Sequence, residues 1–294
     1  MNVVQIIGPS YCGSTVLGYA LNTVPGFFFA SEVKRVLYSY RKNNGFSFPV
    51  CDFCGESCHY WSSDFFNKIN NVNDLKKVYQ CFSESYPDVE FFVDSSKLIS
   101  DYKGTNAFAK IVCVKHPVRM LASQLYNVRK KININVSSYA AFKSILSEEP
   151  SYYLDYSKLY LDKLCRTYSD IKSEYAEFFY FKTDLAHLEK MKIFDDLMNY
   201  LGVCDRKIDV ENFSSYRCHS LGGNRAPVNL MKKKNDQFFT VDSRSKYYDK
   251  ALCLGDWKID EKYKELLPRN FLDEICESSE FKKALKVLEY SNIY

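Results

Sequence analysis

Several features that would assign the chain to a specialised class are missing from its 294 residues. No apolar run approaches the roughly 18–20 residues that a membrane-spanning helix needs, so the sequence predicts no membrane span. There is no internal repeat and no low-complexity tract. Met1 and Asn2 lead directly into the apolar run VVQII, without the basic segment that opens a secretory leader. We therefore expect a protein of the cytoplasm.

An excess of charge of one sign is also missing. The chain has 40 lysines and arginines against 36 aspartates and glutamates, a formal net charge of +4. This mild excess suits a small anionic ligand and is too weak to predict nucleic-acid binding. We expect a small-molecule partner, and neither a nucleic acid nor a membrane; the oligomeric state is left open.

Cysteine, in contrast, is plentiful. The count of 11 is odd, and no secretory leader accompanies it. Free thiols in a reducing compartment are the expectation for such a chain. The hydrophobic share of 46% and the charged share of 26% are those of a globular protein. The length is sufficient for one large α/β domain with a substantial core.

Short apolar runs alternate with amphipathic segments along the chain. The runs predicted as buried strands are 3–7, 89–93, 110–114 and 177–181. The amphipathic segments between them are 15–23, 62–82, 117–130, 151–174 and 184–201. This alternation predicts a three-layer α/β fold, with a central parallel sheet and helices on both faces. We expect a single domain over 1–294, with irregular insertions near 41–61 and 205–256.

The stretch GPSYCGST, residues 8–15, follows the first predicted strand. It fits the phosphate-loop pattern G-x-x-x-x-G-K-[ST] except that Ser14 occupies the lysine position. Backbone N–H groups of such a loop, with the helix N-terminus behind them, can hold a phosphate or sulfate. The hydroxyls of Ser14 and Thr15 add donors. The alternative is an ordinary strand–turn–helix joint.

Two later stretches supply cations that the loop lacks. The strand in FFVDSSKL, residues 91–98, ends in a polar cluster that carries Lys97. In IVCVKHPVRMLASQL, residues 111–125, Lys115 ends a strand and Ser123 follows eight residues later. Two helical turns return Ser123 to the face on which the helix begins. A cation and a hydroxyl are thus expected to meet at a second anion.

Together these stretches resemble the sulfotransferases that use 3′-phosphoadenosine 5′-phosphosulfate (PAPS). That family has a phosphosulfate loop of the form basic-S-G-[ST]-T and a later 3′-phosphate motif, R-[DN]-P-x5-S. The matching positions here are Tyr11, Cys12, Gly13, Ser14 and Thr15 for the first, and Lys115, His116, Pro117 and Ser123 for the second. The resemblance implies a phosphate-loop nucleotide-binding fold of the sulfotransferase type. Tyr11, Lys115 and His116 depart from the family's usual residues.

Three further segments are similar to the bacterial and tyrosylprotein branches of the family: ASEV at 30–33, VDSSK at 93–97 and CHSLGGNR at 218–225. The resemblance implies that Glu32 is the general base and that Lys97 stabilises charge on the bridging oxygen. It further implies that Gly223, Asn224 and Arg225 close over the donor. His116 and His219 are alternative bases.

The sequence therefore predicts an enzyme that moves a sulfuryl group from PAPS to a hydroxyl or nitrogen of a small metabolite or natural product. The product of the donor would be 3′-phosphoadenosine 5′-phosphate (PAP), and no metal is required. A carbohydrate acceptor is the alternative within this class. A phosphate-loop kinase, with Asp94 as its magnesium ligand, and a non-catalytic PAPS-binding module are the alternatives outside it.

A cysteine cluster ending in tryptophan, CDFCGESCHYW at 51–61, is similar to one found in many bacterial members of the family. The spacing of Cys51, Cys54 and Cys58 is compatible with a structural zinc site. His59 or another cysteine could complete it, but the sequence shows no clear fourth ligand. Free thiols, or a disulfide formed on oxidation, are favoured over zinc.

Overall fold

The computed structural model of the chain describes residues 1–34, 37–38, 51, 53–69, 74–129, 134–136, 138–185, 190–209, 218–221 and 262–291. Most of the two segments expected to be irregular insertions lies outside these described residues. Gly223, Asn224 and Arg225 also lie outside them. None of the described helices is long and apolar enough to cross a membrane.

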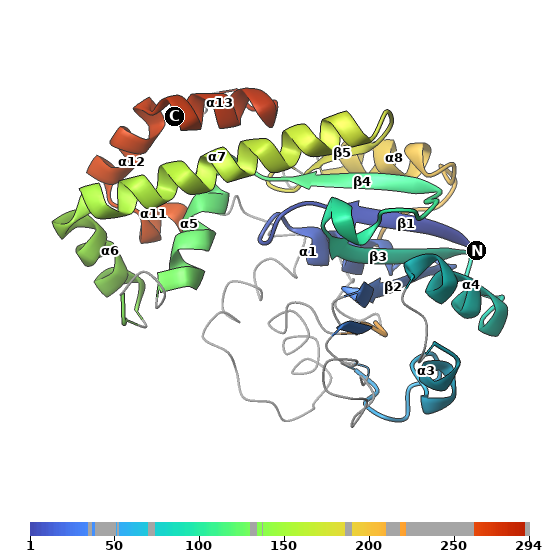
Figure 1. Cartoon of the computed structure of the whole chain (residues 1–294). Helices are drawn as coiled ribbons and strands as arrows, with labels where there is room; N and C mark the ends of the chain where they lie inside the picture. The colour runs from blue at the N-terminus through green and yellow to red at the C-terminus, as the bar shows by residue number, and fades with distance from the viewer. Residues whose placement is uncertain are drawn as a thin grey trace.

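A parallel sheet forms the centre of the structure (Figure 1). Its strands are β1 (Asn2–Ile7), β2 (Phe27–Ser31), β3 (Phe91–Lys97), β4 (Ala109–Val114) and β5 (Phe179–Lys182). They are ordered β2-β3-β1-β4-β5, and every pair is parallel. The predicted parallel sheet is confirmed, because the four apolar runs each form a strand and FFFAS adds the fifth.

Helices occupy the segments between the strands, and further helices follow β5. They are α1 (Ser14–Leu21), α3 (Ser63–Ile69), α4 (Leu75–Ser85), α5 (Pro117–Val128), α6 (Tyr139–Glu148), α7 (Pro150–Glu174), α8 (Lys190–Tyr200), α11 (Lys262–Leu266), α12 (Arg269–Glu277) and α13 (Ser279–Val287). The amphipathic stretch 62–82 is two helices rather than one. A new helix starts there because Asp74 caps α4, accepting a hydrogen bond from the Lys76 amide at 2.9 Å.

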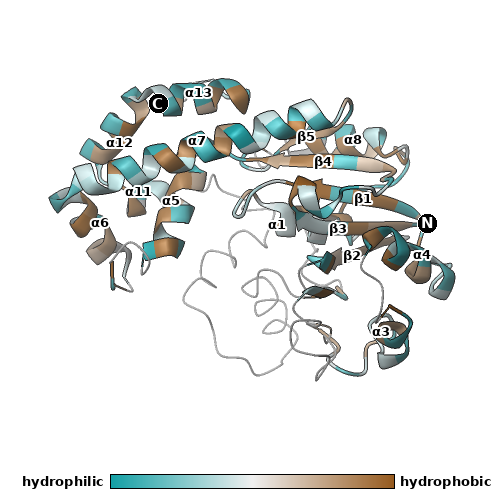
Figure 2. Ribbon diagram, in the orientation of Figure 1, coloured by the Kyte–Doolittle hydropathy of each residue, from teal (hydrophilic) through white to brown (hydrophobic). Residues whose placement is uncertain are grey.

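Neighbouring side chains of β2 show that helices cover both faces of the sheet. The ring of Phe28 packs against Phe82 of α4, with centroids 4.9 Å apart. The ring of Phe29 points to the other face and meets Tyr19 of α1 at 5.3 Å. Because successive strand residues alternate faces, α1 and α4 lie on opposite sides. The strands between them are predominantly hydrophobic (Figure 2). The predicted three-layer arrangement is confirmed.

The longest of the described helices, α7, lies over the sheet near β4 and β5 at its C-terminal end and extends beyond the sheet, and α13 packs along it (Figure 1). Tyr168 of α7 is fully buried and donates a hydrogen bond to the Cys113 carbonyl of β4 at 2.7 Å. Helix α7 thereby packs on β4, and α12 and α13 pack on α7.

The strand order defines where a ligand is expected. The chain leaves β1 toward β2 and β3 on one side, and continues through β4 and β5 on the other. The connections change direction between β1 and β4, and ligands of open α/β sheets bind at the carboxyl ends of the strands at such a point. The loop after β1 and Lys115 after β4 both lie there.

Candidate functional site

The loop between β1 and α1 has a backbone that its sequence makes possible. Gly13 has φ 97°, in the left-handed region that glycine enters at little cost. A Cβ on Gly13 would lie 2.5 Å from Cγ2 of Thr183, so a side chain at this position would also collide with its neighbour. Tyr11 has φ 72° and, like Ser10, is exposed. Two left-handed residues fold the loop tightly against the start of α1.

The N-terminus of α1 is arranged to accept an anion. The helix begins at Ser14, has no side-chain cap and has no acidic residue in its first turn. The first amides of a helix lack acceptors within the helix, and the helix dipole makes this end positive. The hydroxyl residues Ser14 and Thr15 stand in that first turn. These are the donors that a phosphate or sulfate group would need.

Hydrogen bonds fix the loop to two neighbouring strands. The amide of Gly8 donates to the Lys97 carbonyl of β3 at 3.0 Å. The hydroxyl of Thr183, the residue after β5, donates to the Cys12 carbonyl at 2.6 Å and lies 2.9 Å from the Val114 carbonyl. The loop is therefore held between the ends of β3, β4 and β5.

An ion pair joins the candidate base to the candidate catalytic cation. Glu32 directly follows β2 and Lys97 ends β3, and the Lys97 ammonium donates a hydrogen bond to Oε1 of Glu32. The Glu32 side chain is 6% exposed and that of Lys97 is 18% exposed. The pair is mostly withdrawn from solvent, so screening by water and salt is reduced and the charges interact strongly.

Both strands are distorted where they present these side chains. Ser31 has φ 68° and Lys97 has φ 78°, values that residues other than glycine adopt rarely. The pairing register shifts between Phe29 and Ser31, and again beside the end of β3. Bulges of this kind redirect side chains next to active sites. Strained residues tend to gather at functional sites, because the surrounding structure must hold them in place.

Asp94, the predicted magnesium ligand of the kinase alternative, lies inside the protein. Its Oδ1 accepts hydrogen bonds from the amide and hydroxyl of Ser96, and its Oδ2 accepts one from Tyr79. Burial raises the pKa of Asp94 to about 6, although these donors act in the opposite direction. Its carboxylate organises the end of β3 and is fully buried rather than presented to a ligand.

The second predicted anion site lies at the start of α5. Lys115 follows β4 and is half-buried, while Ser123 is buried two turns into the helix. The helix starts with Pro117 at its first position and has no acidic residue in its first turn. Lys115 and the N-terminus of α5 thus both follow the carboxyl end of β4.

His116, an alternative base in the sequence analysis, lies under the C-terminal segment. Its ring contacts Phe281 of α13 and Tyr290, with centroids at 5.9 Å and 5.3 Å. Its amide donates to Asp184, whose carboxylate also accepts from Arg119 and Tyr290. Burial lowers the pKa of His116 from 6.5 to about 4. The position indicates a structural residue rather than a base for an external substrate.

The lowered pKa of His116 predicts a pH dependence of stability. Between pH 6.5 and 4 the unfolded chain binds this proton more readily than the folded protein, so stability falls as pH falls through that window. From pH 7 to pH 5 the contribution is a loss of about 2 kcal/mol in the free energy of unfolding. His116→Gln should lose less stability over this interval by about that amount, as measured by urea denaturation at both pH values.

The wild type and His116→Gln must be compared because Asp94 has the opposite effect on the pH dependence of stability. Its raised pKa means that the folded protein takes up a proton near pH 6, which stabilises it on acidification. Asp94 is common to both proteins, so their difference isolates His116. The exposed His59 provides the control, His59→Gln. An unchanged pH dependence in His116→Gln would contradict the placement of His116.

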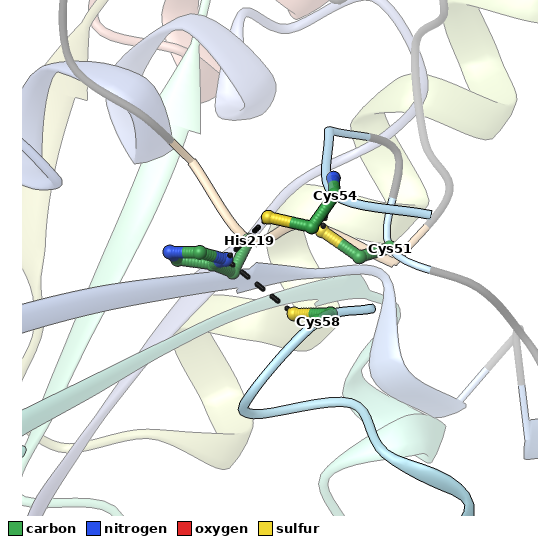
Figure 3. Close-up of side chains that lie close together, drawn as sticks. All are labelled: Cys51, Cys54, Cys58 and His219. Atoms are coloured by element: carbon green, nitrogen blue, oxygen red, sulfur yellow. Dashed lines mark hydrogen bonds between the residues drawn. The ribbon is translucent and has the colours of Figure 1, made fainter. Parts of the chain in front are cut away.

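The structure places a fourth potential metal ligand, His219, beside the cysteine cluster, and the sequence did not predict it. His219 lies beside Cys51, Cys54 and Cys58, and its Nδ1 is 3.3 Å from Sγ of Cys54 and 3.4 Å from Sγ of Cys58 (Figure 3). His59, the histidine within the same segment, is exposed instead and contacts Tyr60 and Tyr86. The sequence could not supply this pairing, because His219 is 161 positions from Cys58.

The structure brings some predicted site residues together and adds others. Glu32 meets Lys97, and the loop at 11–15 lies beside the end of β3. Thr183 and Asp184 were missed, although their position directly after an apolar strand is a signal for a binding edge. Thr183 holds the loop and Asp184 holds the start of α5.

Comparisons with known proteins do not assign a function to the chain. No protein-family model matches the chain, and no curated protein matches it. Among solved structures it is similar to the sulfotransferase domain from the Synechococcus PCC 7002 olefin synthase, with a TM-score of 0.49 and 13% identity over 98% of this chain and 93% of that one. A functional assignment therefore rests on the residues around the loop.

Proposed function

We propose that the chain is a sulfotransferase that moves a sulfuryl group from PAPS to a hydroxyl or nitrogen of a small molecule. The observation that carries the proposal is the buried pair of Glu32 and Lys97 at the carboxyl ends of β2 and β3. The pair lies next to a loop whose sequence resembles a phosphate-binding loop. The amide of Gly8, in this loop, donates a hydrogen bond to the carbonyl of Lys97. A candidate base, a candidate catalytic cation and a candidate anion site at one edge of the sheet support the proposal.

Each side chain has a role in an in-line displacement at sulfur. The acceptor oxygen or nitrogen forms a bond to sulfur while the bond from sulfur to the bridging phosphate oxygen breaks. Glu32 takes the acceptor's proton, and Lys97 stabilises the charge that develops on the departing phosphate. Before the donor binds, each of these groups neutralises the other. Donor binding would attract Lys97 to the phosphosulfate and release the Glu32 carboxylate for the acceptor.

The two ends of the donor fit two separate sources of positive charge. The 5′-phosphosulfate would bind the amides and hydroxyls at Ser14 and Thr15, where no acidic residue opposes it. The 3′-phosphate would bind Lys115 and Ser123 at the start of α5. Arg225 and its neighbours, outside the described residues, remain candidates to close over the donor. This division of charge accounts for a phosphate loop without its own lysine.

Among the described residues, Asp94, the predicted metal ligand of the kinase alternative, is not presented to a ligand. A kinase needs a carboxylate that reaches a magnesium ion bridging the phosphates. Asp94 is fully buried, and its two oxygens accept hydrogen bonds from Ser96 and Tyr79. Magnesium-bridged triphosphate binding is therefore the less favoured function for this loop.

PAP is expected to stabilise the protein against heat in the absence of magnesium. A ligand that binds only the folded state at 100 times its Kd adds about 2.7 kcal/mol to the free energy of unfolding. For a chain of this size that corresponds to a rise of several degrees in Tm. The measurement is a thermal melt with PAP and EDTA, compared with ATP and magnesium.

Lys115→Ala provides the matched control for the 3′-phosphate. It removes a charge-assisted hydrogen bond, so the variant should lose most of the shift with PAP. It should keep the smaller shift with adenosine 5′-phosphosulfate, which has no 3′-phosphate. Stabilisation by ATP with magnesium but not by PAP would overturn the proposed function.

A further inference from the structure

A cluster of three thiols and one imidazole is formed by residues outside the loop at 8–15. Cys51, Cys54 and Cys58 come from one segment and His219 from another (Figure 3). The four ligand atoms all lie within 4.8 Å of one another. Cys51 and Cys58 are buried, and Cys54 and His219 are partly buried. No step of the proposed reaction uses any of these groups.

The spacing of these atoms is close to that of ligands around a tetrahedral metal ion. Bonds of about 2.3 Å to sulfur and about 2.0–2.1 Å to nitrogen place neighbouring sulfur and nitrogen ligands about 3.6 Å apart. The same geometry places two sulfur ligands about 3.8 Å apart. The observed distances from His219 Nδ1 to Cys54 and Cys58 are 3.3 Å and 3.4 Å. Small side-chain rotations would suffice to close the four atoms around an ion.

The backbone around Cys51 orients its sulfur atom. The amides of Phe53 and Cys54 point to Sγ of Cys51, at 3.4 Å and 3.5 Å. The chain turns back at Gly55, whose φ is 62° and whose amide donates to the Cys51 carbonyl at 3.0 Å. This turn brings Cys54 over Cys51. Hydrogen bonds to a ligating sulfur orient it and stabilise its negative charge.

The fourth ligand is oriented by its neighbours. Trp61 donates a hydrogen bond from Nε1 to the carbonyl of His219. The imidazole stacks parallel to Phe28, with centroids 6.1 Å apart, and contacts Tyr60 at 4.9 Å. These contacts fix the plane of the ring with Nδ1 toward the sulfur atoms (Figure 3). The tryptophan that ends the cysteine segment thus secures the histidine.

We propose that Cys51, Cys54, Cys58 and His219 bind a structural zinc ion. Three thiolates and an imidazole suit zinc, whereas magnesium and calcium prefer oxygen ligands. All four positions of a tetrahedral ion are filled by protein, so no position remains for water or substrate. This makes the site structural rather than catalytic.

The ion would join two distant segments beside the Glu32 strand. The amide of Leu221 donates to the Ala30 carbonyl at 3.1 Å, and Leu221 forms a bridge with Ser31. Leu221 is two residues from His219, and Ala30 and Ser31 are within two residues of Glu32. Zinc at the cluster would therefore hold 218–221 against the end of β2. The ion does not depend on the proposed sulfotransferase activity.

Metal analysis of the full chain, purified in a reducing buffer with zinc in the growth medium, tests the proposal. We expect one zinc ion per chain by elemental analysis. Replacement by cobalt should give the visible absorption of a tetrahedral thiolate site, with an intense sulfur-to-cobalt charge-transfer band. Removal of the ion by a strong chelator should lower Tm, and zinc should restore it.

Matched variants locate the ion. His219→Asn and Cys54→Ser should lose the bound zinc or bind it at least 10-fold more weakly, because mutation of even an outer-shell partner of a metal ligand costs about 10–100-fold in metal affinity. His59→Asn and Cys81→Ser, which change a histidine and a cysteine outside the cluster, should keep it. If a ligand variant fails to fold, the cobalt spectrum of the wild type still shows whether the cluster binds a metal ion.

Two results would overturn the proposal. One is a wild-type protein that contains no zinc and gives no thiolate–cobalt spectrum, including the case in which two of the cysteines form a disulfide under reducing conditions. The other is a His219→Asn variant that binds metal as tightly as the wild type. PAP binding is measured separately, so failure of the zinc site is distinguishable from failure of the proposed function.

Discussion

Glu32→Gln is expected to lower the rate of sulfuryl transfer at least about 10²-fold, because a positioned general base contributes about 10²–10⁴-fold. Glutamine keeps the size of the side chain but cannot accept the acceptor's proton. The donor site should remain intact, since the loop is held by Gly8 and Thr183 rather than by Glu32. The affinity for PAP, measured by calorimetry, should therefore stay near that of the wild type while kcat falls.

The acidity of the acceptor and a distant glutamate provide the controls. An acidic acceptor ionises with less help, so Glu32→Gln should slow its sulfonation less. Glu90, at the amino end of β3 and paired with Arg206, is the matched position, and Glu90→Gln should leave the rate unchanged. Substantial activity in Glu32→Gln, with activity abolished in a His116 or His219 variant, would assign the base to a histidine.

The sheet was predictable from sequence because its strands are short, apolar and buried on both faces. Runs such as VVQII and KIVCV carry this pattern without help from the rest of the fold. The loop after β1 was predictable as well, because Gly8 and Gly13 mark a backbone that other residues enter with difficulty. The left-handed conformations of Ser31 and Lys97 were not, because neither residue type favours them.

Contacts between distant segments were the other part that the sequence could not supply. Glu32 and Lys97 were each predicted as site residues, but their pairing across 65 positions depends on β2 and β3 being neighbours. His219 was considered as a base and instead lies against the cysteine cluster. Asp94 follows an apolar run in the sequence, as a metal ligand often does. Its burial against Tyr79 could not be predicted, because it results from the packing of α4 on β3.

Lys97→Met is expected to reduce both activity and stability. Loss of one preorganised group that stabilises developing charge costs about 10²–10³ in kcat. Loss of one partner of a buried ion pair leaves the other charge uncompensated, at a cost of roughly 3–5 kcal/mol in the free energy of unfolding when burial is complete. Lys97 retains some exposure, which places the expected loss toward the lower end. Methionine keeps the aliphatic stem, so the loss reports the charge rather than the packing.

The double variant Glu32→Gln/Lys97→Met separates the two effects of Lys97. With both charges removed, no buried carboxylate is left without its cation, so the double variant should be more stable than Lys97→Met alone. Its activity should stay as low as that of the single variants, because both the base and the cation are missing. Urea denaturation and steady-state rates of the four proteins complete the cycle, and Lys103→Met, at an exposed lysine, is the control. Additive stability losses in the cycle would show that the two charges do not interact, and would remove the ion pair as the basis of the site.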